Sequence, residues 1–152
     1  SESAALAARI ITDDQIAELE HTIERMANAA HDTPDGDDAD RDFHMLISKA
    51  TGNAANLFMM ENLWRMRTEL PEVRKVYSAV CVEDSSHRVD EHSEILDALR
   101  NRNPDEARRA MRHHFSRLIE ALLDASEQQA IEEARKRSSA NREKYLKTAL
   151  SG

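Results

Sequence analysis

The sequence predicts an all-α protein, an antiparallel bundle of about six to seven helices. The 152 residues contain only 3 Gly and 3 Pro, roughly 4% against a usual ~12% for the two together. β-Sandwiches and barrels need turn residues every ~8–12 positions, so this composition argues against them. Apolar residues instead recur every three to four positions, which is the spacing of amphipathic helices. One domain of this length is large enough to bury its own core.

The charge and the hydropathy pattern exclude several classes of protein. The chain has 29 acidic residues against 21 Lys and Arg, a net charge of −8, which opposes binding to a phosphate backbone. Its single cysteine, Cys81, excludes an internal disulfide, and no signal peptide or run of ~18 apolar residues is present. We therefore expect a soluble, cytoplasmic chain that binds no membrane and does not hold DNA alone.

Two helices are predicted at the start of the chain. The alanine-rich residues 4–10 predict a short helix, and Thr12 with Gln15 has the form of a capping box that begins a second one. The apolar stripe of this second helix consists of Ile16, Leu19, Ile23, Met26 and Ala30.

The acidic, turn-rich residues 32–38 predict a solvated loop before a third helix. This helix is expected to continue to about Ala50, and Gly52 is expected to end it. Gly36 and Gly52 would thus frame it.

Asn53 is a suitable cap for a fourth helix, which Pro71 interrupts. The expected buried stripe of this helix consists of Leu57, Met60, Leu63, Trp64 and Leu70. Residues 71–82 permit no assignment.

A fifth helix is predicted over residues 83–100, with Val89, Ile95, Leu96 and Leu99 on one side. Asn103 and Pro104 then provide an Asn cap with Pro at the first helical position. They predict a sixth helix that carries Ala107, Met111, Leu118 and Leu122 inward and continues past Ile131. Residues 132–152 form a basic C-terminal tail whose helicity the pattern leaves open. Short connections make neighbouring helices antiparallel.

Helical neighbours separate the seven histidines into two groups. His92 and His114 have apolar residues three and four positions away and are predicted to point inward. Charged neighbours place His21, His87 and His113 on polar faces, and His31 lies at a helix end. His44 lies one turn after Asp40 and one turn before Ile47, so the Asp40/His44 pair is also predicted to face inward.

The turn near Arg102 brings the inward histidines to one height. His92 lies ten residues before it and His114 twelve after, which is about 15 and 18 Å along the two helices at ~1.5 Å per residue. Buried imidazoles at one height need a shared polar partner. A divalent metal ion in the core of the bundle is one candidate, and a buried His–Asp hydrogen-bond network is the other.

Five segments in order resemble the FCD domain, the C-terminal effector-binding domain of FadR-type regulators in the GntR family. They are residues 2–8 (ESAALAA), 40–44 (DRDFH), 50–53 (ATGN), 91–99 (EHSEILDAL) and 107–115 (ARRAMRHHF). The resemblance implies an FCD-type domain over residues 1–131. In that family one Asp and three His bind a divalent metal, and the pattern falls here on Asp40, His44, His92 and His114.

The resemblance implies a sensor rather than an enzyme. Zinc or nickel suits the imidazoles best, and manganese or iron is also compatible. The metal and a cation would hold a small organic acid, a carboxylate or 2-hydroxy acid, and Arg67 is the candidate cation because its neighbours place it on a buried stripe. The effector would act on DNA through a homodimer and a winged-helix domain that is absent from this chain. The alternatives are a helical metalloenzyme that uses the Asp/His site and a metal-free helical interaction module.

Overall fold

The protein is all-helical throughout the residues that the computed structural model describes, which are 1–29, 34–71, 73–74, 77 and 85–150. These residues form no strand, which confirms the predicted fold class. The helices are α1 (Glu2–Ile10), α2 (Asp13–Asn28), α3 (Pro34–Ala50), α4 (Ala54–Glu69), α6 (Ser85–Arg100) and α7 (Pro104–Leu150).

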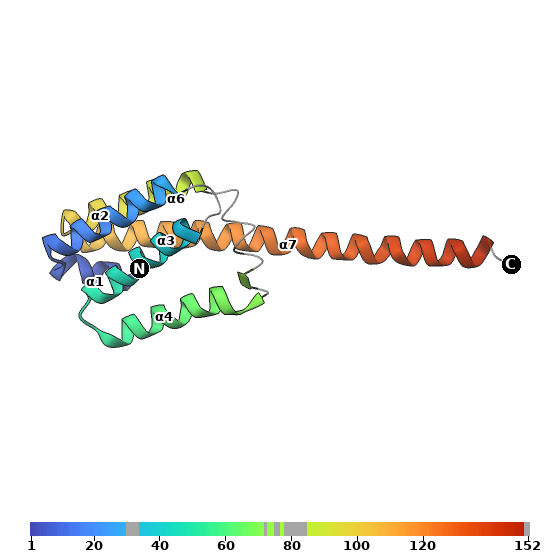
Figure 1. Ribbon diagram of the computed structural model, residues 1–152, viewed down its shortest axis with the longest axis horizontal. Coiled ribbons are helices and arrows are strands. Elements are labelled where there is room, and N and C mark those ends of the chain that lie inside the picture. Colours follow the sequence, from blue (N-terminus) through green and yellow to red (C-terminus); the bar gives the residue numbers. More distant parts are fainter. Residues whose placement is uncertain (30–33, 72, 75–76, 78–84, 151–152) are drawn as a thin grey trace.

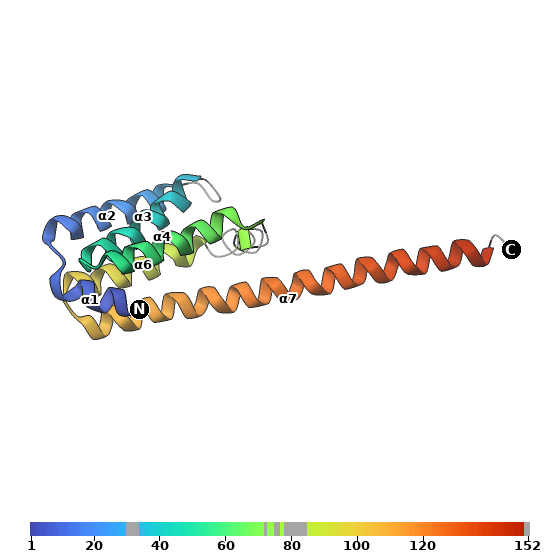
Figure 2. The same ribbon diagram turned by 90° about the horizontal axis from the view of Figure 1, so that it is seen from below.

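The bundle consists of α1, α2, α3, α6 and the first part of α7 (Figures 1 and 2). Helix α2 packs against α3 and α6, while α1 and α6 pack against α7. Helix α4 lies along α3 at the edge of the bundle, and the second part of α7 projects far beyond it (Figure 1). No helix within the described ranges is long and apolar enough to cross a membrane.

The start of α2 has the predicted capping box. The Thr12 hydroxyl accepts the Gln15 N–H at 3.2 Å, and the Gln15 side chain accepts the Thr12 N–H at 3.0 Å. These two bonds satisfy backbone donors that the first turn of a helix cannot pair.

Helix α3 begins earlier than the sequence predicted. Pro34 is its first residue, so the expectation of a loop through residue 38 is wrong for residues 34–38. Proline suits the first helical position because it lacks the N–H that would go unpaired there, and acids such as Asp35 and Asp37 favour the first turn. Gly36 therefore lies inside the helix, where an added Cβ would be 3.3 Å from Ala29 Cβ and from an Arg88 nitrogen. Close packing explains this glycine.

Helix α4 begins as predicted, but its stripe is not buried. Gly52 has a φ of +64°, and the Asn53 side chain accepts the Ala55 N–H at 2.9 Å. However, no residue of α4 is fully buried, and Leu63 and Leu70 are 58% and 42% exposed. The prediction of a buried stripe is wrong for Leu63 and Leu70, because α4 lies at the edge of the bundle and packs mainly on α3, while Leu57, Met60 and Trp64 are half-buried.

Helices α6 and α7 form the antiparallel pair that the sequence predicted. The Asn103 side chain accepts the Glu106 N–H at 3.2 Å at the start of α7. Residues 83 and 84, the predicted start of α6, lie outside the described residues, as do most of residues 71–82. The basic tail is helical as far as Leu150, because α7 runs without a break for 47 residues. The domain boundary after residue 131 stays a prediction.

The core lies where α1, α2, α3, α6 and α7 meet. Its largest fully buried side chains are Phe43, Ile11, Leu19, Ile47, Ile95, Leu99, His92 and Ser48. An imidazole and a hydroxyl thus lie in the most buried part of an otherwise apolar interior.

Truncating a core leucine should cost far more stability than truncating an edge leucine. Leu99 is 0% exposed and Leu63 is 58% exposed. Leu99→Ala should lower the free energy of unfolding by about 2–5 kcal/mol, because it removes buried methyl groups and leaves a cavity. Leu63→Ala is the matched control and should change it by about 0.5 kcal/mol or less. Urea denaturation measures both, and equal losses would contradict the observed core.

Candidate metal centre

Three buried imidazoles from three helices meet in the core. His44 comes from α3, His92 from α6 and His114 from α7, and they are 4%, 0% and 8% exposed. The ring centroid of His44 is 5.3 Å from those of His92 and His114, which are 4.7 Å apart. One nitrogen from each ring lies within 4.8 Å of the other two. This spacing suits three ligands of one metal ion.

The α6–α7 turn places His92 and His114 at the same height, as predicted. Arg102 in this turn has a φ of +49°, a left-handed conformation that glycine usually occupies. Its guanidinium offsets the strain by bonding the Ile11 carbonyl and, at 2.8 Å, the Asp13 carboxylate. The turn is therefore tied to the α1–α2 connection, and this fixes the register of the helices that carry the two histidines.

Asp40 adds a buried carboxylate to two of the three histidines. Its Oδ1 atom is 3.0 Å from His92 Nε2 and 3.3 Å from His44 Nε2. Burial by itself opposes ionisation, but the hydrogen bonds to the two imidazoles outweigh it and hold the pKa of Asp40 well below its ordinary value. The carboxylate is therefore ionised at neutral pH and supplies one negative charge to the cluster.

The hydrogen bonds around the cluster leave lone pairs that a cation would satisfy. His92 Nδ1 is 2.6 Å from the Arg88 carbonyl oxygen, which can only accept, so Nδ1 carries a hydrogen. In neutral His92 the Nε2 lone pair then faces an ionised carboxylate, and this contact requires a proton or a metal ion between the two atoms. His44 Nδ1 is also buried without a hydrogen-bond partner among the described residues. The donor set thus fits a metal ion.

Glu91 orients His114 and was not predicted. His114 Nδ1 lies 2.8 Å from Glu91 Oε2, so the other ring nitrogen is left for the cluster. Arg117 completes the group, with Nη2 also 2.8 Å from Oε2. Histidine ligands of metal sites commonly donate their second N–H to a carboxylate or a carbonyl in this way. The sequence contained a signal for this contact: Arg117 lies one turn after His114, and His114 is level with Glu91 by the same count from Arg102.

Arg67 reaches the cluster from α4, where it was the predicted cation. Its guanidinium bonds Asp40 Oδ2 at 2.9 Å and Asp37 Oδ1 at 3.2 Å. It also lies over the rings of Trp64 and Tyr77, at 4.5 and 4.7 Å from their centroids. Because Arg67 uses Oδ2, the Oδ1 atom of Asp40 remains directed at the histidines.

Burial keeps His44 and His114 uncharged. It lowers the pKa of His44, and together with the nearby His44 and His92 rings it lowers the pKa of His114 to about 3. Neutral imidazole is the form that binds metal ions. The histidines predicted to face outward, His21, His87 and His113, are exposed, and His31 lies outside the described residues.

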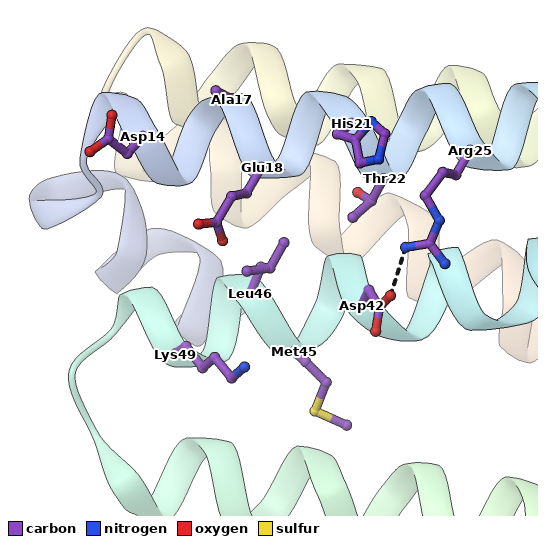
Figure 3. Close-up of a pocket in the computed structure, with 10 residues that line it drawn as sticks. All are labelled: Asp14, Ala17, Glu18, His21, Thr22, Arg25, Asp42, Met45, Leu46 and Lys49. Carbon is purple, nitrogen blue, oxygen red and sulfur yellow. Dashed lines mark hydrogen bonds and ion pairs between the residues drawn. The ribbon is translucent and has the colours of Figure 1, made fainter.

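A separate open groove of about 570 Å³ lies between α2 and α3 on the outer face of the bundle (Figure 3). Arg25 and Asp42 form a 2.7 Å ion pair across it, beside Glu18, His21 and Lys49. None of the four predicted metal ligands lines this groove.

The family model of the FCD domain matches residues 1–117, so the resemblance found in the sequence is confirmed. The Uxu operon regulator of Haemophilus influenzae is 28% identical over 128 residues, which are 84% of this chain and 48% of that protein. The HTH-type transcriptional repressor NanR of Enterobacter sp. is 29% identical over 110 residues, 72% of this chain and 42% of the repressor. The chain spans less than half of the length of these two relatives.

A solved structure shares the fold. Escherichia coli McbR/YncC matches with a TM-score of 0.69 and 24% sequence identity, over 80% of this chain and 57% of that one.

Acid should destabilise the metal-free chain through its buried imidazoles. The unfolded chain protonates histidine near pH ~6.5, whereas folded His114 stays neutral down to a pKa of about 3. The contribution of neutral His114 to the free energy of unfolding is therefore fully present above pH ~6.5 and is lost as the pH falls below that value. At pH ~5.5 the loss from one such histidine is about 1.4 kcal/mol, or roughly 3–5 °C in Tm.

Thermal denaturation with a chelator, at pH ~7.5 and ~5.5, measures this effect. The Tm of His114→Gln should fall less on acidification than the Tm of the unchanged chain. The Tm of His113→Gln, a variant of the exposed neighbour, should fall as much as that of the unchanged chain. An equal pH dependence in all three proteins would show that His114 titrates normally in the fold.

Proposed function

Because the chain belongs to the FCD domain family, we propose that it is the ligand-sensing domain of a bacterial GntR-type transcriptional regulator. In this proposal it binds a divalent metal ion and a small carboxylate metabolite. Binding modulates DNA recognition by a winged-helix domain attached to it in the cytoplasm. The observation that carries the proposal is the buried cluster of His44, His92 and His114 beside the Asp40 carboxylate.

The chemistry of the cluster supports a metal ion as the resident cofactor. Asp40, His44, His92 and His114 would hold it, with three neutral imidazoles and one carboxylate as ligands. Zinc and nickel suit this donor set best, and manganese and iron tolerate it. When bound, the ion would supply a Lewis-acidic centre with an affinity for anions.

The charge around the cluster favours an anionic effector. A divalent ion with one carboxylate ligand keeps a net charge near +1, and an octahedral ion with four protein ligands keeps two positions open. Arg67 lies beside Asp40 and is half-buried, so it can bind the distal end of an organic acid. Guanidinium groups bind carboxylates with two parallel hydrogen bonds.

An effector at this position has a physical route to the rest of the bundle. Arg67 joins α4 to α3 through Asp40, and Glu91 joins α6 to α7 through His114. A ligand that competes for Arg67 changes the contact between Arg67 and Asp40. Regulation requires that the ligand favour one helix arrangement over the other, which a homodimer would transmit to DNA-binding domains.

The matched relatives favour a regulator over the two other classes. The Uxu operon regulator and NanR are both transcription regulators by name. A metalloenzyme would share the metal site but turn over a substrate, and a metal-free interaction module would lack the ion altogether.

Chain purified without added metal should contain about one divalent ion per chain. Asp40→Asn and His92→Ala should lower the metal content at least tenfold, because each removes a ligand from a buried site. His87→Ala is the matched control, since His87 is exposed on the same helix as His92. Elemental analysis measures metal content, and circular dichroism checks that each variant is folded. A folded chain without metal that takes up no zinc or nickel on addition would favour the interaction module.

A small organic acid should stabilise the metal-loaded chain in a saturable way. Ligand at ~100 times its Kd adds about 2.7 kcal/mol of stability, which is roughly 5–10 °C in Tm. Arg67→Ala should lose most of this shift relative to its own baseline. Arg65→Ala is the control, because Arg65 is exposed and pairs with Glu69.

A panel of carboxylates and 2-hydroxy acids, read by thermal shift and then by chromatography of the recovered ligand, tests this prediction. Recovery of the acid unchanged supports a sensor. Conversion of the acid to a product would favour the metalloenzyme, and equal shifts in both arginine variants would exclude Arg67 from the site.

A further inference from the structure

The second part of α7, residues 118–150, lies outside the FCD match, and most of it extends past the other helices of the bundle (Figures 1 and 2). Leu118, Ala121, Leu122 and Ala125 are half-buried, whereas residues 131–147 are all exposed. Long apolar side chains lie on this surface. Ile119, Leu123 and Tyr145 are 54%, 64% and 76% exposed. Helices depend mainly on tertiary packing for their stability, so this segment fits a further partner.

Nine exposed residues of this segment lie on one face of the helix, at spacings of four and eleven residues. Eleven residues make just over three complete turns of an α-helix, so residues at this spacing form a nearly straight stripe. Three such sets lie side by side: Ile119, Ala130 and Asn141; Leu123, Ala134 and Tyr145; Glu127, Ser138 and Ala149. All nine residues are exposed. We call them the α7 stripe.

The α7 stripe is complementary to itself when it is reversed about Ala134. Ile119 then lies opposite Ala149, and Leu123 lies opposite Tyr145. In this arrangement every residue of the stripe lies opposite another residue of the stripe on the second copy. The middle of the stripe contains only Ala130, Ala134 and Ser138, and these small side chains permit close approach of two backbones.

The charge of the segment also reverses about Ala134. Residues 118–134 contain five acids and no Lys or Arg, whereas residues 135–150 contain six Lys or Arg and one acid. The two halves therefore carry net charges of −5 and +5. An antiparallel pair of these helices puts each acidic half against a basic half, and a parallel pair puts like charges together. Charge complementarity of this kind selects orientation in helix pairs.

We propose that residues 118–150 of α7 pair antiparallel with the same segment of a second copy of this chain, with the twofold axis at Ala134. The pairing rests on the homodimer of the proposed function and gives it a surface, but it does not involve the metal cluster. At ~1.5 Å per residue the paired segment is about 50 Å long, so the two bundles lie at its opposite ends.

Disulfide crosslinking in a Cys81→Ser background tests the position of the axis. Ala134→Cys meets its own copy and should form a covalent dimer on mild oxidation, to more than half of the chain. Ala140→Cys is the matched control, an exposed alanine on the same helix that would lie about 18 Å along the axis from its copy. It should crosslink at least tenfold less. Equal crosslinking of the two variants would overturn the proposal.

A second pair of variants tests the direction. Leu123→Cys and Tyr145→Cys should each fail to crosslink alone, because each would lie about 33 Å from its own copy. They should crosslink when mixed. Crosslinking of Leu123→Cys with itself would indicate a parallel pair and overturn the antiparallel one.

Sedimentation of the full chain measures dimer formation directly, without introduced cysteines. The unchanged chain should sediment as a dimer whose Kd rises more than tenfold when Leu123→Glu and Tyr145→Glu are combined. A monomer at ~100 μM, or a dimer indifferent to these substitutions, would overturn the proposal. Metal content measured on the same samples should not change, which separates a failure of the pairing from a failure of the metal site.

Discussion

The buried carboxylate of Asp40 is the contact on which the rest of the arrangement depends. Asp40 on α3 contacts His44 from the same helix, His92 from α6 and Arg67 from α4. Three helices therefore meet at one negative charge. A charge in an apolar interior is costly unless every lone pair has a partner. The register of the three helices must therefore satisfy this one group. The buried carboxylates and imidazoles, Asp40, Glu91, His44, His92 and His114, accordingly lie together in one cluster.

A second ionic group ties the other side of the cluster to the longest helix. Glu91 on α6 holds both His114 and Arg117 on α7. The cluster is thus flanked by two acid–arginine contacts, one to α4 and one to α7. In the proposed sensor domain, a ligand bound at the centre would alter either contact. Helix α4 is the easier one to move, since it packs mainly on α3 and has no fully buried residue.

Helix α7 combines two kinds of surface in one element. Its first part carries buried Ala107, Met111 and His114, and residues 131–147 of its second part are all exposed. The change follows from what lies beside it: the other helices lie along the first part, and the rest of α7 extends past them (Figures 1 and 2). A segment that the bundle does not cover keeps its helical form through caps, local ion pairs or a further partner, and the self-complementary α7 stripe favours a partner.

The sequence by itself determined the features that depend on local physics. Caps at Thr12, Asn53 and Asn103 set helix starts, and apolar neighbours identified His92 and His114 as inward, because both effects act within one or two turns. Only the tertiary structure decided that Leu63 is exposed, that Glu91 is buried and that Arg67 reaches Asp40. Each of these depends on which helix lies against which and at what height. Helical periodicity identifies an apolar face, but it does not specify how much of that face a neighbour covers.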